Sequence, residues 1–397
     1  MYKTLYGFLI WFILTLCCIY AFSLNTATAV FSDAIKNSLQ ASDMEVSCAA
    51  GSFILGFAGM QIPAGYLLDR YNARYIVSGG LLLFALGNMA ASHASNIYIY
   101  SLANLVQGMG ASFDFIAATI LISQWFSPKM FPILTGLIET LAFTATGILH
   151  YFLVLQLKKY EWHQIYHYFS LYGFSLFILV LLIVKTPANH QFAKDISLRQ
   201  SLACVCKNQQ LWLCVIALAT SFGVVLAYGG LWYLPIQHYY AVESGEASLI
   251  GGMIFFGMGM GTPLLAWFSN FMKSRKLVIH LSLVLGNMGL IMAIYFPHYL
   301  IDTYIIIKAI TFLTGFLLSG ATLFYTMISE MSPNSTKGVA FSITNISLYL
   351  FNTMMMLIPL LFITITSRQF FTYLWILPFS VMISILLLYF IRETYPK

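Results

Sequence analysis

Charge is scarce in this sequence: only 8% of its 397 residues are Asp, Glu, Lys or Arg, whereas 60% are hydrophobic. Soluble proteins have about 25% charged residues, so a water-soluble fold of this composition would leave too much apolar surface in water. The mean hydropathy of +0.83 indicates that lipid surrounds most of the chain. A soluble enzyme or a soluble binding domain is therefore excluded.

Cysteine and catalytic motifs are also sparse. Cys204 and Cys206 form one C-x-C, but no second pair and no histidine ligands accompany it, which disfavours a metal site. His163 and His167 form one H-x-x-x-H pair, whereas the patterns H-E-x-x-H and G-x-S-x-G are missing. We expect no disulfide, no metal, no cofactor and no enzymatic activity.

Long apolar runs fill the chain instead. Each is about 20 residues or longer, which is enough to span a bilayer as a helix. The runs cover residues 5–30, 47–68, 76–95, 97–122, 131–156, 164–185, 210–236, 247–269, 277–297, 302–327, 338–365 and 370–391. Backbone polar groups in lipid must be paired within the segment, so these runs are predicted to be helices. The sequence predicts an all-α integral membrane protein with twelve spans, the first being too long for a signal peptide.

Basic residues predict the orientation. Of the 19 lysines and arginines, fourteen lie at the termini or in the loops on their side, four lie in the opposite loops, and Lys308 lies within a span. Cytoplasmic loops of membrane proteins are rich in Lys and Arg. Both termini are therefore predicted to be cytoplasmic, and the net charge of +6 reflects topology rather than nucleic-acid binding.

The chain is built from two halves. A polar interval at 186–209 separates an N-terminal bundle of six spans, 1–185, from a C-terminal bundle of six spans, 210–397, and is predicted to be a cytoplasmic linker. The third span of each half carries a similar segment, ALGNMA at 85–90 and VLGNMG at 284–289. Internal repeats of this kind are typical of transporters that bind substrate near the bilayer midplane between the halves.

The segment GYLLDRYNARYIV, residues 65–77, places several charges between the second and third spans. Gly65, Asp69, Arg70 and Arg74 match the pattern G-x-x-x-D-R-x-x-x-R/K, and in this the chain resembles the major facilitator superfamily over essentially its full length. The resemblance implies that Asp69 latches the cytoplasmic side shut by contacting the N-terminus of the eleventh helix. The alternative is that Arg70 and Arg74 only set the topology.

A weaker copy of this loop lies in the second half at 266–276. Asn270 stands where the pattern has aspartate, but Arg275 is kept. Glu330, after the tenth helix, resembles the acidic residue of the family pattern E-x-x-P-x-x-x-R-G. The resemblance predicts a second gate latch in which Arg275 pairs with Glu330.

Two features depart from the family. Asn104 stands where the resemblance leads us to expect an arginine in helix 4. Asn104 has no charge, so it cannot take over the role that this arginine has in proton-coupled members. The drug/proton antiporters carry a glycine–proline motif in the fifth helix, whereas the stretch TGLIETLAFTATGILH of the fifth span contains no proline and therefore lacks this motif. This absence disfavours drug efflux.

Three ionisable residues stand out within the predicted spans: Asp114, Glu139 and Lys308. Such a residue costs about 3 kcal/mol or more in hydrocarbon, so each is a candidate for substrate or proton binding. Asp114 is alternatively a structural carboxylate, Glu139 alternatively serves the gate, and Lys308 alternatively reaches the outer surface.

Further polar or aromatic residues share helix faces with these charges or lie on helices that the resemblance places around a central cavity. The candidates for substrate binding are Asn104, Gln107, Tyr228, Trp232 and Asn345. Plain packing is the alternative for the aromatic residues.

These features predict an alternating-access secondary transporter of a small polar metabolite, an amino acid or an organic anion, with proton-coupled uptake. The alternatives are multidrug or metabolite efflux by proton antiport and passive facilitated transport; a receptor or scaffold without transport is a further rival. The expected partners are a small-molecule substrate, protons and the lipid bilayer, with no nucleic acid. We expect a monomer in a bacterial inner membrane.

Overall fold

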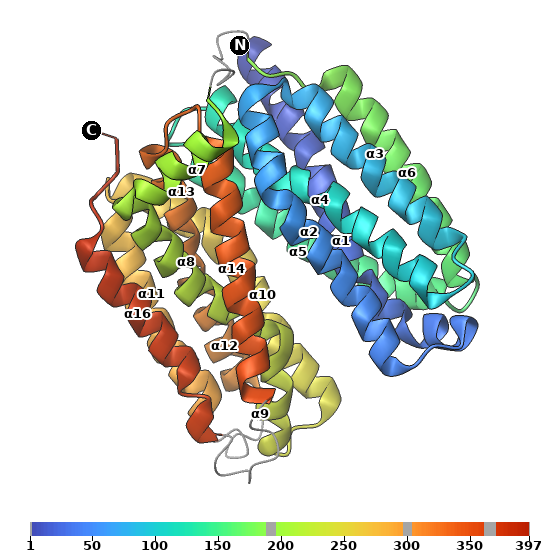
Figure 1. The fold of residues 1–397 in the computed structure, drawn as a ribbon. Helices are drawn as coiled ribbons and strands as arrows, with labels where there is room; N and C mark the ends of the chain where they lie inside the picture. The colour runs from blue at the N-terminus through green and yellow to red at the C-terminus, as the bar shows by residue number, and fades with distance from the viewer. Residues whose placement is uncertain (1, 188–195, 297–303, 361–370, 397) are drawn as a thin grey trace. The chain divides into compact units, whose positions relative to one another are not determined.

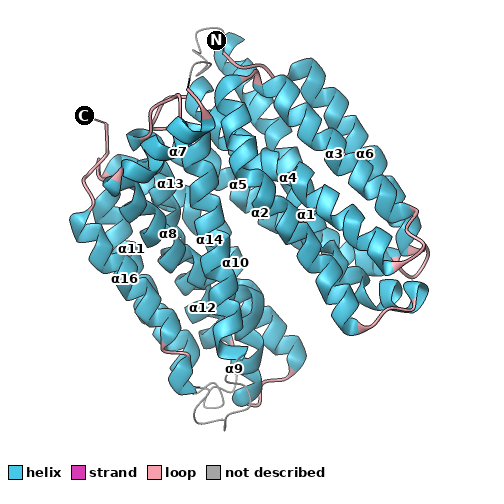
Figure 2. Cartoon of the chain, in the orientation of Figure 1, coloured by secondary structure: helices cyan, strands magenta, loops and turns pink. Residues whose placement is uncertain are grey.

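The computed structural model describes residues 2–187, 196–296, 304–360 and 371–396, which form helices joined by short loops, with no strand in these ranges (Figure 2). Eleven helices in the described part are long and apolar enough to cross a membrane, and a shorter apolar helix covers Phe131–Thr146. The predicted all-α membrane fold is confirmed.

Six helices make up the first half of the chain. They are α1 (Tyr2–Leu39), α2 (Asp43–Arg70), α3 (Ala73–Ser92), α4 (Ile97–Trp125), α5 (Phe131–Gln156) and α6 (Trp162–Ile183) (Figure 1). α1 continues beyond the apolar run that predicted it, so Lys36, which we expected in a loop, lies in the last turn of the helix.

The second half begins after a short helix, α7 (Leu198–Lys207), which lies in the predicted linker. Its elements are α8 (Gln209–Ala227), α9 (Tyr233–Tyr239), α10 (Ser244–Phe271), α11 (Arg275–Tyr295), α12 (Ile305–Leu318), α13 (Leu323–Met331), α14 (Lys337–Leu360) and α16 (Ile376–Phe390) (Figure 1).

Two predicted spans of the second half are interrupted helices. A π-helical segment, Tyr228–Trp232, joins α8 to α9, and a 3₁₀ segment, Ser319–Thr322, joins α12 to α13. Irregular turns within helices often mark functional positions, and interrupted spans are a feature of transporter binding sites.

The helices form two compact units. The first unit consists of Met1–Ser127, Leu141–Leu202 and Pro333–Ser342, and the second of Pro128–Thr140, Ala203–Ser332 and Ile343–Lys397. The first turns of α14 thus belong to the first unit, and the first turns of α5 belong to the second. This grouping decides which distant residues meet at the sites described below.

Within the first unit, α4 packs against both α2 and α3, and α3 packs against α6. Within the second unit, α12 packs against α10 and α11, and α8 packs against α16. α2 and α10 each contain one internal proline, Pro63 and Pro263, which is a further similarity between the halves.

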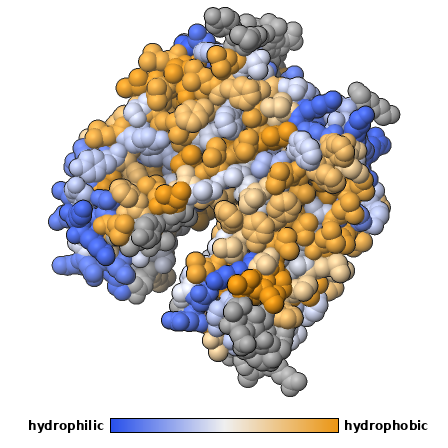
Figure 3. Space-filling model, turned by 180° about the vertical axis from the view of Figure 1, so that it is seen from behind, coloured by the Kyte–Doolittle hydropathy of each residue, from blue (hydrophilic) through white to orange (hydrophobic). Residues whose placement is uncertain are grey.

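Apolar side chains also cover the outside of the helices, and hydrophobic residues dominate the face in Figure 3. Large exposed examples come from several helices, among them Phe12, Leu102, Phe256 and Leu386. A soluble protein rarely exposes apolar area of this extent, so this surface fits contact with lipid.

Candidate functional site

Asp69, in the last turn of α2, caps the N-terminus of α14. Its Oδ1 accepts a hydrogen bond from the backbone N–H of Gly338 at 2.7 Å, and its Oδ2 accepts one from Val339 at 3.3 Å. The side chain is buried. The first N–H groups of a helix have no partner within the helix and carry partial positive charge, so a carboxylate is well suited to this position.

Close helix packing surrounds this cap. A Cβ atom on Gly65 would collide with the carbonyl group of Gly338, and a Cβ atom on Gly338 would collide with the carbonyl group of Gly65. The hydroxyl of Ser342 donates to the carbonyl of Gln61 at 2.7 Å, one turn further along both helices. Glycine on both helices lets the two backbones approach closely enough for Asp69 to reach the α14 amides.

The two arginines of the same loop have different partners. Arg70 is buried and places its Cζ 3.6 Å from the centre of the Tyr66 ring, a favourable cation–π geometry. Arg74, at the start of α3, donates from Nε to the carbonyl of Val184 at 3.1 Å, just after α6 ends. Cations stabilise the C-terminal end of a helix, so Arg74 holds the ends of α3 and α6 together.

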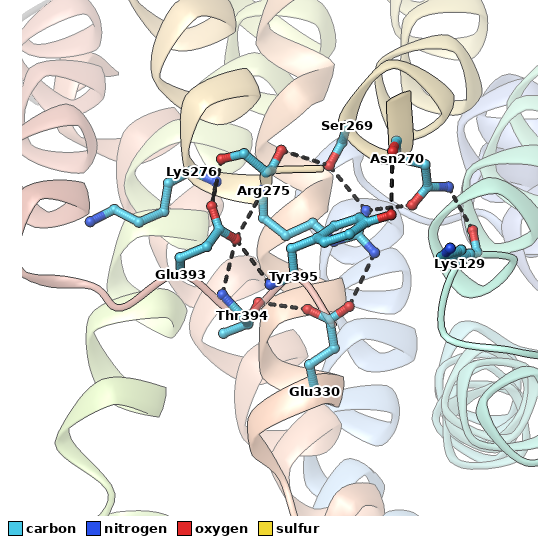
Figure 4. A network of polar contacts seen from close by, with 10 residues as sticks. Lys129, Ser269, Asn270, Arg275, Lys276, Glu330, Glu393, Thr394 and Tyr395 are labelled. Atoms are coloured by element: carbon cyan, nitrogen blue, oxygen red, sulfur yellow. Dashed lines mark hydrogen bonds and ion pairs between the residues drawn. The ribbon is translucent and has the colours of Figure 1, made fainter. Parts of the chain in front are cut away.

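In the second unit, Arg275 is the centre of a polar network (Figure 4). Its guanidinium is fully buried, with Nη2 3.1 Å from Oε1 of Glu330. Its Nη1 donates to Oδ1 of Asn270 at 2.8 Å and to Oγ of Ser269 at 3.0 Å. The pair that the sequence predicted is therefore present, and it is supported by neutral acceptors.

Asn270 takes part in this network in a way that aspartate could not. Its Oδ1 accepts from Arg275, while its Nδ2 donates to the carbonyl of Lys129 at 2.7 Å, immediately before α5 (Figure 4). An ionised carboxylate only accepts hydrogen bonds. The departure from the family pattern at Asn270 therefore supplies a donor that this unit uses.

Asp114 lies deep in α4, where its side chain is 1% exposed. Among the described residues, neither of its carboxylate oxygens has a hydrogen-bond partner. Cys17 and Tyr20 of α1 lie within electrostatic reach of it. A buried carboxylate is costly when it is ionised and unpaired, which distinguishes Asp114 from an ordinary structural acid.

The polar neighbours of Asp114 on α4 contact other helices of the first unit. Asn104 donates to the carbonyl of Tyr100 at 2.9 Å and accepts from Thr28 of α1 at 3.5 Å. Gln107 donates to the carbonyl of Gly87 of α3 at 3.4 Å. Both amides are buried, and these contacts tie α4 to α1 and α3.

Glu139, two turns into α5, is the buried acid of the second unit. It is 5% exposed, and its Oε2 has no hydrogen-bond partner in the part of the chain that is described. Tyr325 of α13 lies within electrostatic reach of it and donates to Oδ1 of Asn345 at 2.6 Å. A carboxyl group, a phenol and an amide from three helices are thus gathered in one region.

Comparison with known proteins identifies the family. Residues 12–240 match the family model described as Major Facilitator Superfamily. The chain belongs to this superfamily. It is a multi-pass membrane protein of a superfamily of transporters, as the resemblance of the loop around Asp69 implied.

Two solved structures of members of this superfamily have a similar fold to this chain. The proton:xylose symporter XylE has a TM-score of 0.76 and 13% identity, with 99% of this chain and 97% of that chain covered. The fucose:proton symporter FucP of E. coli has a TM-score of 0.74 and 15% identity, with 97% and 98% covered. At such low identity the likeness concerns the fold alone.

Relatives found by sequence match this chain over shorter stretches. The multidrug resistance protein MdtL of Shewanella oneidensis is 25% identical over 155 residues, 38% of each chain. MdtL of Shigella dysenteriae is 21% identical over 272 residues, 66% of this chain and 67% of that protein. The chain thus spans little more than a third of the length of the Shewanella relative.

Two other predicted site residues, Lys308 and Trp232, are held by contacts within the protein. Lys308 lies in the first turn of α12, not two turns in as we expected, because the helix begins at Ile305. Its Nζ lies 2.6 Å from Oε2 of Glu246, in the first turn of α10. Tyr228 and Trp232 are buried in the π-helical segment, and Trp232 donates to the carbonyl of Met355 at 2.9 Å.

Several residues of these sites could not be predicted from the sequence. Tyr325 beside Glu139 and Glu246 beside Lys308 gave no signal, because their partners lie on helices far apart in the chain. Glu393, Thr394 and Tyr395 also join the Arg275 network (Figure 4). The only hint was a short polar cluster directly after the last apolar run.

Proposed function

We propose that this protein is a proton-coupled secondary transporter that moves a small polar metabolite by alternating access between its two halves. One observation carries the proposal: each unit contains a buried carboxyl group, Asp114 or Glu139, with at least one carboxylate oxygen unpaired among the described residues. Ionising such a group without a partner is costly. Binding a proton removes that cost, so proton loading and a change of solvent access are coupled.

The substrate class is proposed to be small and polar, an amino acid or an organic anion, taken up into the cell across a bacterial inner membrane. Buried amides and phenols, among them those of Asn345 and Tyr325, support a polar substrate. The Lys308 amine contributes less to this argument than the sequence alone suggested, because Glu246 already neutralises it. The solved symporters with the same fold carry sugars together with protons, which supports the coupling.

Efflux by proton antiport is the second candidate. It is favoured by the relatives named multidrug resistance protein, which match over 38% to 66% of the chain. The absence of the glycine–proline motif from α5 counts against it. Uptake and efflux use the same proton site and differ in the ligand and in its direction, so the ligand decides between them.

The experiment is a thermal-stability screen of the purified protein against a library of metabolites and lipophilic cations, at mildly acidic and at neutral pH. A ligand that binds the folded state raises its apparent stability. A hit is then followed in proteoliposomes with an imposed pH gradient. Loss of gradient-driven uptake in Asp114→Asn or Glu139→Gln, with ligand binding retained, supports proton coupling.

The matched control is Glu243→Gln, because Glu243 is an exposed carboxylate that precedes α10. This variant should transport like the original protein. Hits confined to lipophilic cations would favour efflux, and transport that is indifferent to the pH gradient in every variant would overturn proton coupling in favour of a passive facilitator.

A further inference from the structure

The segment that follows α16 is held against the second unit along its length. Gln210, at the start of α8, accepts from the backbone N–H of Arg392 at 2.8 Å and donates to the carbonyl of Phe390 at 3.1 Å. The Gln210 side chain thus holds the backbone of both the last residue of α16, Phe390, and the segment that follows it. Chain segments beyond the last helix are usually poorly ordered unless they are tied down, so this anchoring needs an explanation.

Glu393 caps the N-terminus of α11. Its Oε1 accepts from the backbone N–H of Arg275 at 3.0 Å, and its Oε2 accepts from that of Lys276 at 3.1 Å. The hydroxyl of Ser274 also donates to Oε2, at 2.5 Å. Ser274 is the local N-cap of α11 and accepts from the backbone N–H of Leu277 at 3.1 Å. Glu393, from the far end of the second half, binds the two preceding amides and so completes the cap.

The next two residues reach the Arg275–Glu330 pair itself. Thr394 donates from Oγ1 to Oε2 of Glu330 at 2.5 Å. The ring of Tyr395 lies 4.9 Å from Cζ of Arg275, and its hydroxyl donates to the carbonyl of Asn270 at 3.3 Å. In Figure 4 the segment lies beside the network with its side chains directed into it.

Charge explains why an acid is needed here. Lys273 lies in the turn between α10 and α11, and Arg275 and Lys276 begin α11, whereas residues 247–301 contain no Asp or Glu. The first-half loop has its own acid, Asp69, but the corresponding position in the second half is Asn270. The negative charges that balance this turn therefore come from Glu330 and Glu393, far along the chain.

The first unit contains a similar arrangement in which the acceptors are neutral. There, the segment after α6 meets the start of α3: Thr186 accepts from the N–H of Ala73 at 3.1 Å, and Val184 accepts from Arg74 at 3.1 Å. In both halves, the chain that follows the sixth span docks on the start of the third span. Because this contact occurs in both halves, we regard it as a structural feature of the fold.

We propose that residues 392–395 form a strap that holds the α10–α11 turn and the Arg275–Glu330 pair in place, with Glu393 supplying the charge that Asn270 lacks. The strap must detach before this turn can rearrange. It is thus a conformational restraint on the second-half latch, and it goes beyond the proposed transport activity, which its test does not require.

The test is hydrogen–deuterium exchange of the full-length protein in detergent. Glu393→Ala removes the acceptor of the Arg275 and Lys276 amides, so exchange at the first turn of α11 should accelerate about tenfold or more, as expected when a capped turn opens locally. Exchange at the first turn of α3 should not change. Thr394→Val, which removes a different contact of the strap, should accelerate exchange at the same turn.

The matched control is Arg392→Gln, which changes an exposed charge of the same strap without removing a cap on α11. It should leave α11 exchange unchanged, and the thermal unfolding midpoint of Glu393→Ala should show that the protein is still folded. Unchanged exchange at α11 in a folded Glu393→Ala would overturn the proposal. So would equal acceleration in both units, since that would indicate general destabilisation.

Discussion

The carboxylate of Asp69 accepts a 2.7 Å hydrogen bond from the backbone N–H of Gly338, a residue 269 positions further along the chain. This contact joins the end of α2 to the start of α14 through backbone amides, and the basic residues Arg70 and Lys337 interact electrostatically with the same carboxylate. Because the donor is a helix N-terminus, the interaction depends on how α14 is placed. An element of this kind can be made or broken as a helix moves, which is what a gate requires.

Asp69→Asn tests the cap. The substitution keeps the size of the side chain but removes the charge that interacts with the α14 N-terminus, so the folded protein should lose about 1 kcal/mol of stability. A detergent unfolding titration measures this loss, and transport of any identified ligand should fall as well. Asp33→Asn, an exposed acid of α1, should change neither quantity; equal losses in both variants would remove the special role of Asp69.

Gly65→Ala tests the close approach of α2 and α14. The added methyl group meets the carbonyl of Gly338, where neither backbone can shift freely, so we expect a loss of about 1–3 kcal/mol from overpacking. Gly59 lies on the same helix with open space at its Cβ position. Gly59→Ala should be neutral or stabilising by up to about 1 kcal/mol, and a matching loss there would refute the steric explanation.

Arg275→Met tests the buried ion pair. Arg275 is fully buried and Glu330 is 11% exposed, so removing one partner should cost about 3–5 kcal/mol by leaving a buried charge uncompensated. The comparison is Lys308→Met, which breaks a pair whose side chains are 26% and 35% exposed. That loss should stay below about 1 kcal/mol. Similar losses for the two variants would contradict the difference in burial.

Low pH should release the strap. Partial burial disfavours the charge of Glu393, but hydrogen bonds from Ser274 and from three backbone amides outweigh it and hold the pKa of this carboxyl below its usual value. A lowered pKa in the folded state stabilises the structure above the unfolded-state value of about 4.3 and loses that contribution as pH falls below it. Exchange at the start of α11, corrected for intrinsic rates, should therefore rise at acidic pH in the original protein and not in Glu393→Ala.

The membrane architecture could be predicted because its cause is local. Each run of about 20 apolar residues must pair its own backbone groups in lipid, so the spans and the fold class follow from composition along the chain. The gate loop around Asp69 was found because its residues are neighbours in sequence. The Arg275–Glu330 pair was predicted only through the family resemblance.

Tertiary structure decided which polar groups meet. The sequence suggested that Lys308 binds an anion, but in the fold Glu246 of α10 pairs with it. Tyr325 of α13 lies near Glu139, and this proximity could not be predicted because the two residues are far apart in the sequence. The strap could not be foreseen, since a hydrogen bond between Glu393 and Arg275 joins residues 118 positions apart and leaves no periodic trace. The sequence by itself determined where the apolar spans lie; long-range packing alone determined which buried charged groups are paired and which have no hydrogen-bond partner among the described residues.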